Sequence, residues 1–123
     1  MATLTPTLTL ASSDMNGDVL NLSVTDSLSI LGQVTTKQVV TSSSSVVFAA
    51  NGGYTKSYVY LKNLSATVAE TILIELASGD NDVINLGAGE FAFFPWSGTH
   101  DLRCDAAQGT PTLEVRIYQE AAA

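Results

Sequence analysis

Apolar and polar residues alternate with a period of two along much of this chain, and this pattern narrows the possible folds more than any other feature. The alternation is clearest in segments 19–24, 58–63, 71–76 and 114–118. Successive side chains of a β-strand point to opposite faces, so each segment can bury one face and expose the other. No stretch carries a helical stripe of apolar residues. The chain is therefore predicted to be all-β.

Clusters of Gly, Asn, Asp and Ser separate the alternating runs and predict turns, because these residues tolerate the backbone conformations of tight turns. The clusters lie at 16–18, 51–53, 78–81, 87–89 and 108–111. Between them the pattern predicts strands near 3–10, 18–24, 27–31, 34–40, 45–50, 56–63, 70–77, 82–86, 90–94, 100–104 and 112–119. One open sheet rarely holds so many strands, and an arrangement as two packed sheets or a closed barrel leaves fewer exposed edges. The expected fold is an antiparallel β-sandwich, jelly-roll-like.

The length of 123 residues fits one domain, and 46% hydrophobic against 14% charged residues is the composition of a folded chain. The serine-rich run at 41–45 brings no shift in composition, so it is interpreted as a loop at the rim of the sandwich. We expect a single domain over 1–123, with residues 1–12 able to form an extended N-terminal arm. The alternating Thr and Leu of 3–10 suit a strand along another chain's sheet edge, and suit an ordinary first strand equally well.

The net charge of −7 argues against binding to nucleic acid or to an anionic membrane surface, since both require clustered basic residues. The five basic residues are scattered: Lys37, Lys56, Lys62, Arg103 and Arg116. No apolar run reaches the length of a membrane span. The first residues lack the pattern of a secretory signal, which predicts synthesis in a cytoplasm.

Catalytic and metal-binding chemistry has little support in the sequence. The one histidine, His100, has Ser97 and Asp101 nearby, but closeness in sequence does not give triad geometry. One histidine and one cysteine, Cys104, cannot build a zinc site, and Cys104 is predicted to be a small core residue. The runs 14–18 and 80–82 carry oxygen ligands that could bind calcium, although Asp and Asn more often hydrogen-bond their own turns. No cofactor, no metal and no enzymatic activity are expected.

Residues 89–100, Gly-Glu-Phe-Ala-Phe-Phe-Pro-Trp-Ser-Gly-Thr-His, resemble the second motif of the cupins. The glycine after the proline is displaced by one place, and Cys104 stands where the cupin motif has asparagine. The first cupin motif, with its paired histidines, is absent from the chain. A metal would have a single ligand, so cupin catalysis is rejected.

The same segment holds four of the nine aromatic residues, Phe91, Phe93, Phe94 and Trp96. Alternation places Phe91 and Phe93 on one face of a strand and Phe94 on the other. One interpretation is a strand buried on both faces, which reads as a near-continuous apolar run. The other is an interface strand, because aromatic residues are enriched in interface cores. Trp96 could also stack on a sugar ring.

Four segments between about residues 56 and 119 form a recognisable pattern. They are Tyr-Val-Tyr-Leu-Lys-Asn-Leu at 58–64, Ile-Leu-Ile-Glu-Leu at 72–76, Leu-Gly-Ala-Gly-Glu-Phe-Ala-Phe-Phe-Pro at 86–95, and Leu-Glu-Val-Arg-Ile-Tyr at 113–118. Together they resemble a pattern found in small virion proteins of tailed bacteriophages. The resemblance implies a β-sandwich decoration or cement protein on the exterior of the capsid. Other proteins of this kind belong to tails or fibres.

The resemblance leads to a hypothesis: a capsid decoration protein that bridges capsid subunits and stabilises the phage head. Its expected partners are the major capsid protein and further copies of itself, as a homotrimer, and its expected location is the virion exterior. The alternative is a tail or fibre component that binds host surface glycans, and a cupin-like or hydrolytic enzyme is a remote third. The residues proposed for an interface are Leu4, Thr5, Leu8, Leu10, Phe94, Pro95 and Trp96.

Overall fold

A computed structural model describes residues 1–16, 20–76 and 82–121. All regular structure in these ranges is β-strand, and every pairing is antiparallel. The strands are β1 (Ala2–Leu4), β2 (Thr7–Ser12), β3 (Leu20–Thr25), β4 (Leu28–Val40), β5 (Val46–Ala49), β6 (Ser57–Asn63), β7 (Ile72–Glu75), β8 (Ile84–Leu86), β9 (Phe91–Trp96), β10 (Leu102–Ala106) and β11 (Thr112–Glu120). The predicted all-β, antiparallel sandwich is confirmed.

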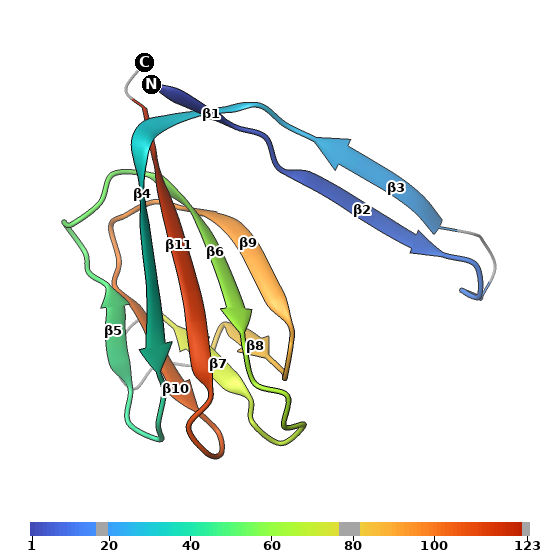
Figure 1. Cartoon of the computed structure of the whole chain (residues 1–123), viewed down its shortest axis with the longest axis vertical. Helices are drawn as coiled ribbons and strands as arrows, with labels where there is room; N and C mark the ends of the chain where they lie inside the picture. Colours follow the sequence, from blue (N-terminus) through green and yellow to red (C-terminus); the bar gives the residue numbers. More distant parts are fainter. Residues whose placement is uncertain (17–19, 77–81, 122–123) are drawn as a thin grey trace.

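Two sheets form the body of the molecule (Figure 1). The larger sheet has the strand order β1-β4-β11-β6-β9, and the smaller one has the order β5-β10-β7-β8. The core between them comprises Phe48, Ala49, Val59, Leu61, Ile72, Ile74, Leu86, Trp96, Leu102, Cys104, Leu113, Val115 and Ile117. Most of these are alternate residues of their strands, so the predicted alternation does place one face of each strand in the core. Full burial of each large aliphatic side chain contributes about 1.5–3 kcal/mol.

The strands predicted at 27–31 and 34–40 are in fact one strand, β4, of 13 residues. Along β11, Tyr118 pairs with Val34 but Glu120 pairs with Ile30, so β4 places three residues opposite the single Gln119. This irregularity is a bulge, and Gly32 lies inside it. The gap predicted between residues 31 and 34 is therefore a bulge within a continuous strand.

The strand predicted at 3–10 is divided at Thr5 and Pro6 into β1 and β2. Proline has no backbone N–H to give to a ladder, so the pairing is interrupted there. The register nevertheless continues, because the residue numbers of each cross-strand pair sum to 32, from Ala2 with Ile30 to Ser12 with Leu20. The amide of Asp26 donates to the carbonyl of Pro6 at 3.1 Å and bridges the interruption. Residues 2–12 and 20–30 thus form the two sides of one long hairpin that bends at Pro6.

The outer part of this hairpin, β2 and β3, leaves the body of the molecule (Figure 1), and we call it the arm. The prediction of an extended arm over 1–12 needs a correction. Residues 2–4 belong to the larger sheet as its edge strand β1, and the projecting part is two-stranded and includes β3. The sequence did not indicate that 7–12 and 20–25 pair with each other alone.

Three of the predicted turns, at 51–53, 87–89 and 108–111, contain a glycine with positive φ, namely Gly52, Gly89 and Gly109. The predicted turns at 16–18 and 78–81 lie wholly or partly outside the described residues. The serine-rich run connects β4 of one sheet with β5 of the other, as a rim loop should. Its first residue, Thr41, is buried and donates its hydroxyl to the carbonyl of Pro111 at 2.6 Å.

Candidate functional site

The arm is an amphipathic ribbon with one apolar and one polar face. Cross-strand pairing sets Leu8 against Val24 and Leu10 against Leu22 on one face, while the intervening pairs, Thr7 with Thr25 and Thr9 with Ser23, lie on the other. The apolar face consists of Leu8, Leu10, Leu20, Leu22 and Val24. Leu8, Leu10, Leu22 and Val24 are 45%, 43%, 42% and 50% exposed. Most of this apolar face therefore has no cover in the single chain.

The arm also lacks the charges that usually protect free strand edges. No residue of 2–13 or 20–25 is charged, and the nearest carboxylates are those of Asp14 and Asp26. Natural proteins commonly place lysine or proline on exposed edges to prevent pairing with other chains. An isolated two-stranded hairpin is at best marginally stable in water. A charge-free ribbon of this kind is typical of a segment that becomes covered on assembly.

A groove of about 380 Å³ lies between the base of the arm and β9, the edge strand of the larger sheet. Leu8 and Val24 line it from the arm, and Phe91 and Phe93 line it from β9. Phe91 is 62% exposed and Phe93 is 40% exposed. The ring of Phe93 stacks on Tyr58 of β6, with centroids 6.5 Å apart. The groove is an apolar, aromatic surface that continues directly into the uncovered face of the arm.

The structure corrects the choice of aromatic face on β9. Phe94 packs against the core, and Trp96 is only 5% exposed. The indole N–H of Trp96 donates to the carbonyl of His100 at 3.1 Å, and its ring lies 5.6 Å from that of Tyr54. Stacking of Trp96 on a sugar is therefore not available. Burial of the strand on both faces is also wrong, because the opposite face presents Phe91 and Phe93 to the surface.

The other residues proposed for an interface divide between the body and the arm. Leu4 is half-buried in β1 opposite Leu28, Thr5 is exposed at the bend, and Pro95 is exposed on β9. Leu8 and Leu10 lie on the apolar face of the arm, where an interface role stays a prediction. Sequence reasoning missed Leu20, Leu22, Val24, Phe91 and Phe93 as members of this surface. The alternation of 20–24 is visible in the sequence, but its pairing with 7–12 is not.

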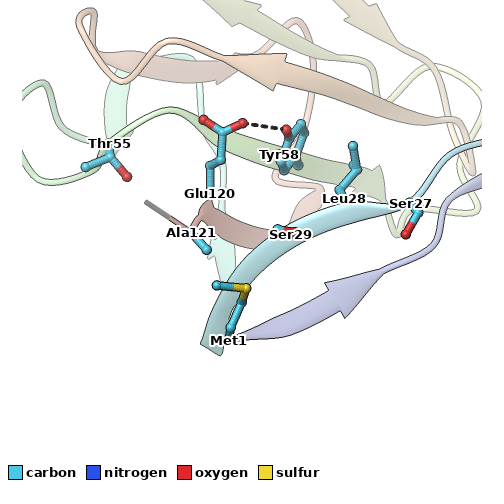
Figure 2. A pocket seen from close by; sticks show the side chains of 8 residues that line it. All are labelled: Met1, Ser27, Leu28, Ser29, Thr55, Tyr58, Glu120 and Ala121. Atoms are coloured by element: carbon cyan, nitrogen blue, oxygen red, sulfur yellow. Dashed lines mark hydrogen bonds between the residues drawn. The ribbon is translucent and has the colours of Figure 1, made fainter. Parts of the chain in front are cut away.

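A second hollow, of about 650 Å³, has Met1 and Ala121 in its lining (Figure 2). The Tyr58 hydroxyl donates to the Glu120 carboxylate at 3.0 Å, and the Lys56 ammonium lies 3.4 Å from the same carboxylate. Lys56 also sits 5.4 Å from the centre of the Tyr58 ring. The charge of Glu120 raises the pKa of Lys56. These contacts tie the end of β11 to β6, and these polar groups are already engaged with one another.

The residues considered for a catalytic triad are each engaged in turn contacts. Ser97 and Thr99 share a hydroxyl–hydroxyl bond of 2.6 Å, and Thr99 lies 3.3 Å from Nδ1 of His100. The carboxylate of Asp101 accepts from the backbone amide of Asn51 at 2.7 Å. In the part of the chain that the structure describes, no three His, Cys, Asp or Glu side chains are close enough to share a metal ion. Asp18, Asp80 and Asn81, from the proposed calcium loops, lie outside the described residues.

Cys104 is fully buried between the sheets, which confirms its prediction as a core residue. Burial, followed by the neighbouring charge of Asp105, raises the pKa of its thiol to about 11. The pKa of Asp105 itself is raised, mainly by burial and then by the charge of Glu75. Glu75 accepts from the Ser45 hydroxyl at 2.5 Å, and Ser45 also accepts from Arg103 at 2.9 Å. This network connects the rim loop to the outer face of the smaller sheet.

Comparison with known proteins finds no matching family model and no matching curated protein. Among solved structures, the chain is similar to one described by the words "Bacillus endospore appendages form a novel family of disulfide-linked pili". The alignment has a TM-score of 0.51 and covers 89% of this chain and 97% of that one. The two chains share a fold. At 16% identity the likeness extends to the fold alone. No helix in the described residues is long and apolar enough to cross a membrane.

Proposed function

We propose that this chain is a non-catalytic structural protein of a virion, of the capsid decoration or cement type, which assembles through its arm. The observation that carries the proposal is the arm itself. It is a charge-free ribbon that projects from the sandwich, and most of the arm's apolar face is uncovered. The resemblance of residues 56–119 to small phage virion proteins supplies the virion context. The sandwich then serves as a rigid body, and the arm serves as its attachment.

The energetics favour attachment by several arms together. Complete burial of a large aliphatic side chain contributes about 1.5–3 kcal/mol, so covering one that is already about half buried adds roughly 1 kcal/mol. The four residues Leu8, Leu10, Leu22 and Val24 would then supply roughly 4 kcal/mol, which is comparable with the smallest estimates of the cost of association. Strand addition along the free edges adds backbone hydrogen bonds. A homo-oligomer that presents several arms to neighbouring capsid subunits gains further from multivalency.

Charge is consistent with a place on the exterior of a particle. The net charge of −7 gives the sandwich no attraction for packaged nucleic acid, and mutual repulsion among the carboxylates keeps unassembled copies soluble. The arm is free of this charge, so it can contact another protein without bringing two carboxylates together.

The test is co-sedimentation of the purified full chain with expanded heads assembled from the major capsid protein of the same genome. Leu10→Thr/Leu22→Thr keeps strand propensity but removes one cross-strand apolar pair, and Thr9→Ser/Ser23→Thr changes the neighbouring pair on the polar face. We expect the wild type and the polar-face variant to sediment with the heads and the apolar-face variant to remain in the supernatant. Equal sedimentation of all three proteins, or of none, would contradict the proposal.

A second candidate is a subunit of a filament, such as a tail, a fibre or a pilus-like appendage, and the shared fold with the appendage protein favours it. The pili of that comparison are described as disulfide-linked. Cys104 is buried in the core, so this chain would have to assemble without such a link through its cysteine. The buried Trp96 gives no support to the glycan-binding form of this candidate. Electron microscopy of the purified protein separates the two, since a filament subunit forms fibres alone.

A further inference from the structure

We infer that the arm of one copy docks into the groove of a second copy, between that copy's arm base and its β9. This inference rests on the proposed structural role of the arm and names the partner that covers the arm in the free protein, before a capsid subunit takes that partner's place. The surfaces that meet are the outer part of the arm's apolar face, Leu10 and Leu22, and the aromatic wall of the groove, Phe91 and Phe93.

Both halves of such a contact are present on one chain. The arm needs an apolar surface to cover it, and the groove needs an apolar insert to fill its 380 Å³. Leu8 and Val24, at the base of the same chain's arm, line the groove. The next pair along the arm, Leu10 and Leu22, does not line it. A foreign partner for the arm would leave the groove open. A second copy fills the groove and covers the arm with the same contact.

Charge favours this contact between identical chains. Two copies that each carry −7 repel one another, and the repulsion is weakest when the contacting surfaces are free of carboxylates. The arm has no charged residue over 7–12 or 20–25, and the β9 wall, from Phe91 to Trp96, has none either. The one carboxylate lining the groove is that of Asp26, at the base of the arm. The carboxylates therefore lie beside the proposed interface and can exclude other registers of docking.

The area available indicates a reciprocal arrangement. Six residues of an antiparallel strand span about 20 Å, and two strands with their side chains are about 10 Å wide, so one face of the arm covers roughly 200 Å². Contact at the face and both edges doubles this to roughly 400 Å², about half of the roughly 800 Å² per partner in a standard interface. Two chains that exchange arms reach that size, because each then buries both its arm and its groove against the same partner. The geometry therefore favours a closed assembly in which every groove is filled.

The experiment measures mass in solution by light scattering for the wild type and three variants of the full chain. Leu10→Thr/Leu22→Thr alters the arm, and Phe91→Thr alters the groove at a residue that is 62% exposed, so folding should be retained. Val40→Thr, at a 69% exposed residue of β4, is the matched control. We expect an oligomer for the wild type and the control, and a rise in the dissociation constant of at least about tenfold for the other two. Circular dichroism confirms that each variant is folded.

Mixing the two defective variants provides a stricter test. In an equimolar mixture, the intact arm of Phe91→Thr can enter the intact groove of Leu10→Thr/Leu22→Thr, while the opposite contact carries both changes. Mixed pairs with one intact contact should therefore associate more strongly than either variant alone and more weakly than the wild type. A monomeric wild type, an oligomer that survives the arm variant, or a mixture that associates no more strongly than either variant alone would each overturn the inference. A monomeric wild type that still sediments with heads through Leu10 and Leu22 would leave the proposed function standing. An oligomer that never sediments with heads would leave the inference standing and contradict the proposed function.

Discussion

Replacement of one leucine in the core and one in the arm should separate the two roles that apolar residues have in this chain. Leu61 of β6 is 0% exposed in the centre of the core, whereas Leu10 of the arm is 43% exposed. Leu61→Ala removes buried methyl groups and leaves a cavity, which costs about 2–5 kcal/mol. Leu10→Ala should cost under about 1 kcal/mol of unfolding free energy. Only about half of the Leu10 side chain is removed from water, and no packed environment surrounds it, so no cavity forms.

These costs are large enough to measure against the total stability. A chain of this length is expected to unfold with about 6–18 kcal/mol, at roughly 0.05–0.15 kcal/mol per residue. With a urea m-value of about 1.5 kcal/mol/M, a loss of about 3 kcal/mol lowers the unfolding midpoint by about 2 M, and the arm variant shifts it by less than about 0.7 M. Trp96, the one tryptophan of the chain and 5% exposed, reports the transition by fluorescence.

Protein concentration is the main control, because an oligomer that dissociates on unfolding makes the midpoint depend on concentration. The comparison therefore belongs at a concentration where the wild type is monomeric and its midpoint is constant. A Leu10→Ala cost equal to that of Leu61→Ala under those conditions would refute the reasoning. It would mean that the arm is part of the folding core and that its exposed face contributes to the stability of the monomer.

Three further outcomes follow from individual residues. Native Cys104 should resist thiol reagents at about pH 8 and react only after unfolding, since a pKa of about 11 leaves about one thiolate in a thousand and the side chain is fully buried. Gly98→Ala should cost more than about 1 kcal/mol in urea unfolding, because φ is +79° and a Cβ there would lie 2.5 Å from the Tyr54 carbonyl oxygen. Asp105→Asn should raise the midpoint of thermal unfolding at about pH 7, and the gain should disappear below pH 3.8. Burial and Glu75 raise the native pKa of Asp105, so stability falls as pH rises from the unfolded pKa through the native one. A gain that persists at low pH would contradict this assignment.

The sequence located most of the strands and the inner residues of the sandwich because a period of two is a local property. The run 114–118 needed no tertiary information to place Val115 and Ile117 on one face, and both are buried. The residues proposed for an interface lie in two different environments, and their interface role stays a prediction. Leu8 and Leu10 do lie on an uncovered surface, while Phe94 and Trp96 face the core. On β9 both faces are aromatic, so alternation defined two faces and could not say which one meets the smaller sheet.

By itself, then, the sequence determined the fold class, the turns that glycine makes possible, and the absence of charge in 2–13 and 20–25. Tertiary structure alone decided that β1 joins the larger sheet, that β4 continues through its bulge, and that β2 and β3 pair only with each other. The physical reason is that alternation fixes which side chains share a face of a strand, whereas strand partners are chosen by contacts between distant residues. The groove arises from such distant contacts, because they bring β9 beside the base of the arm.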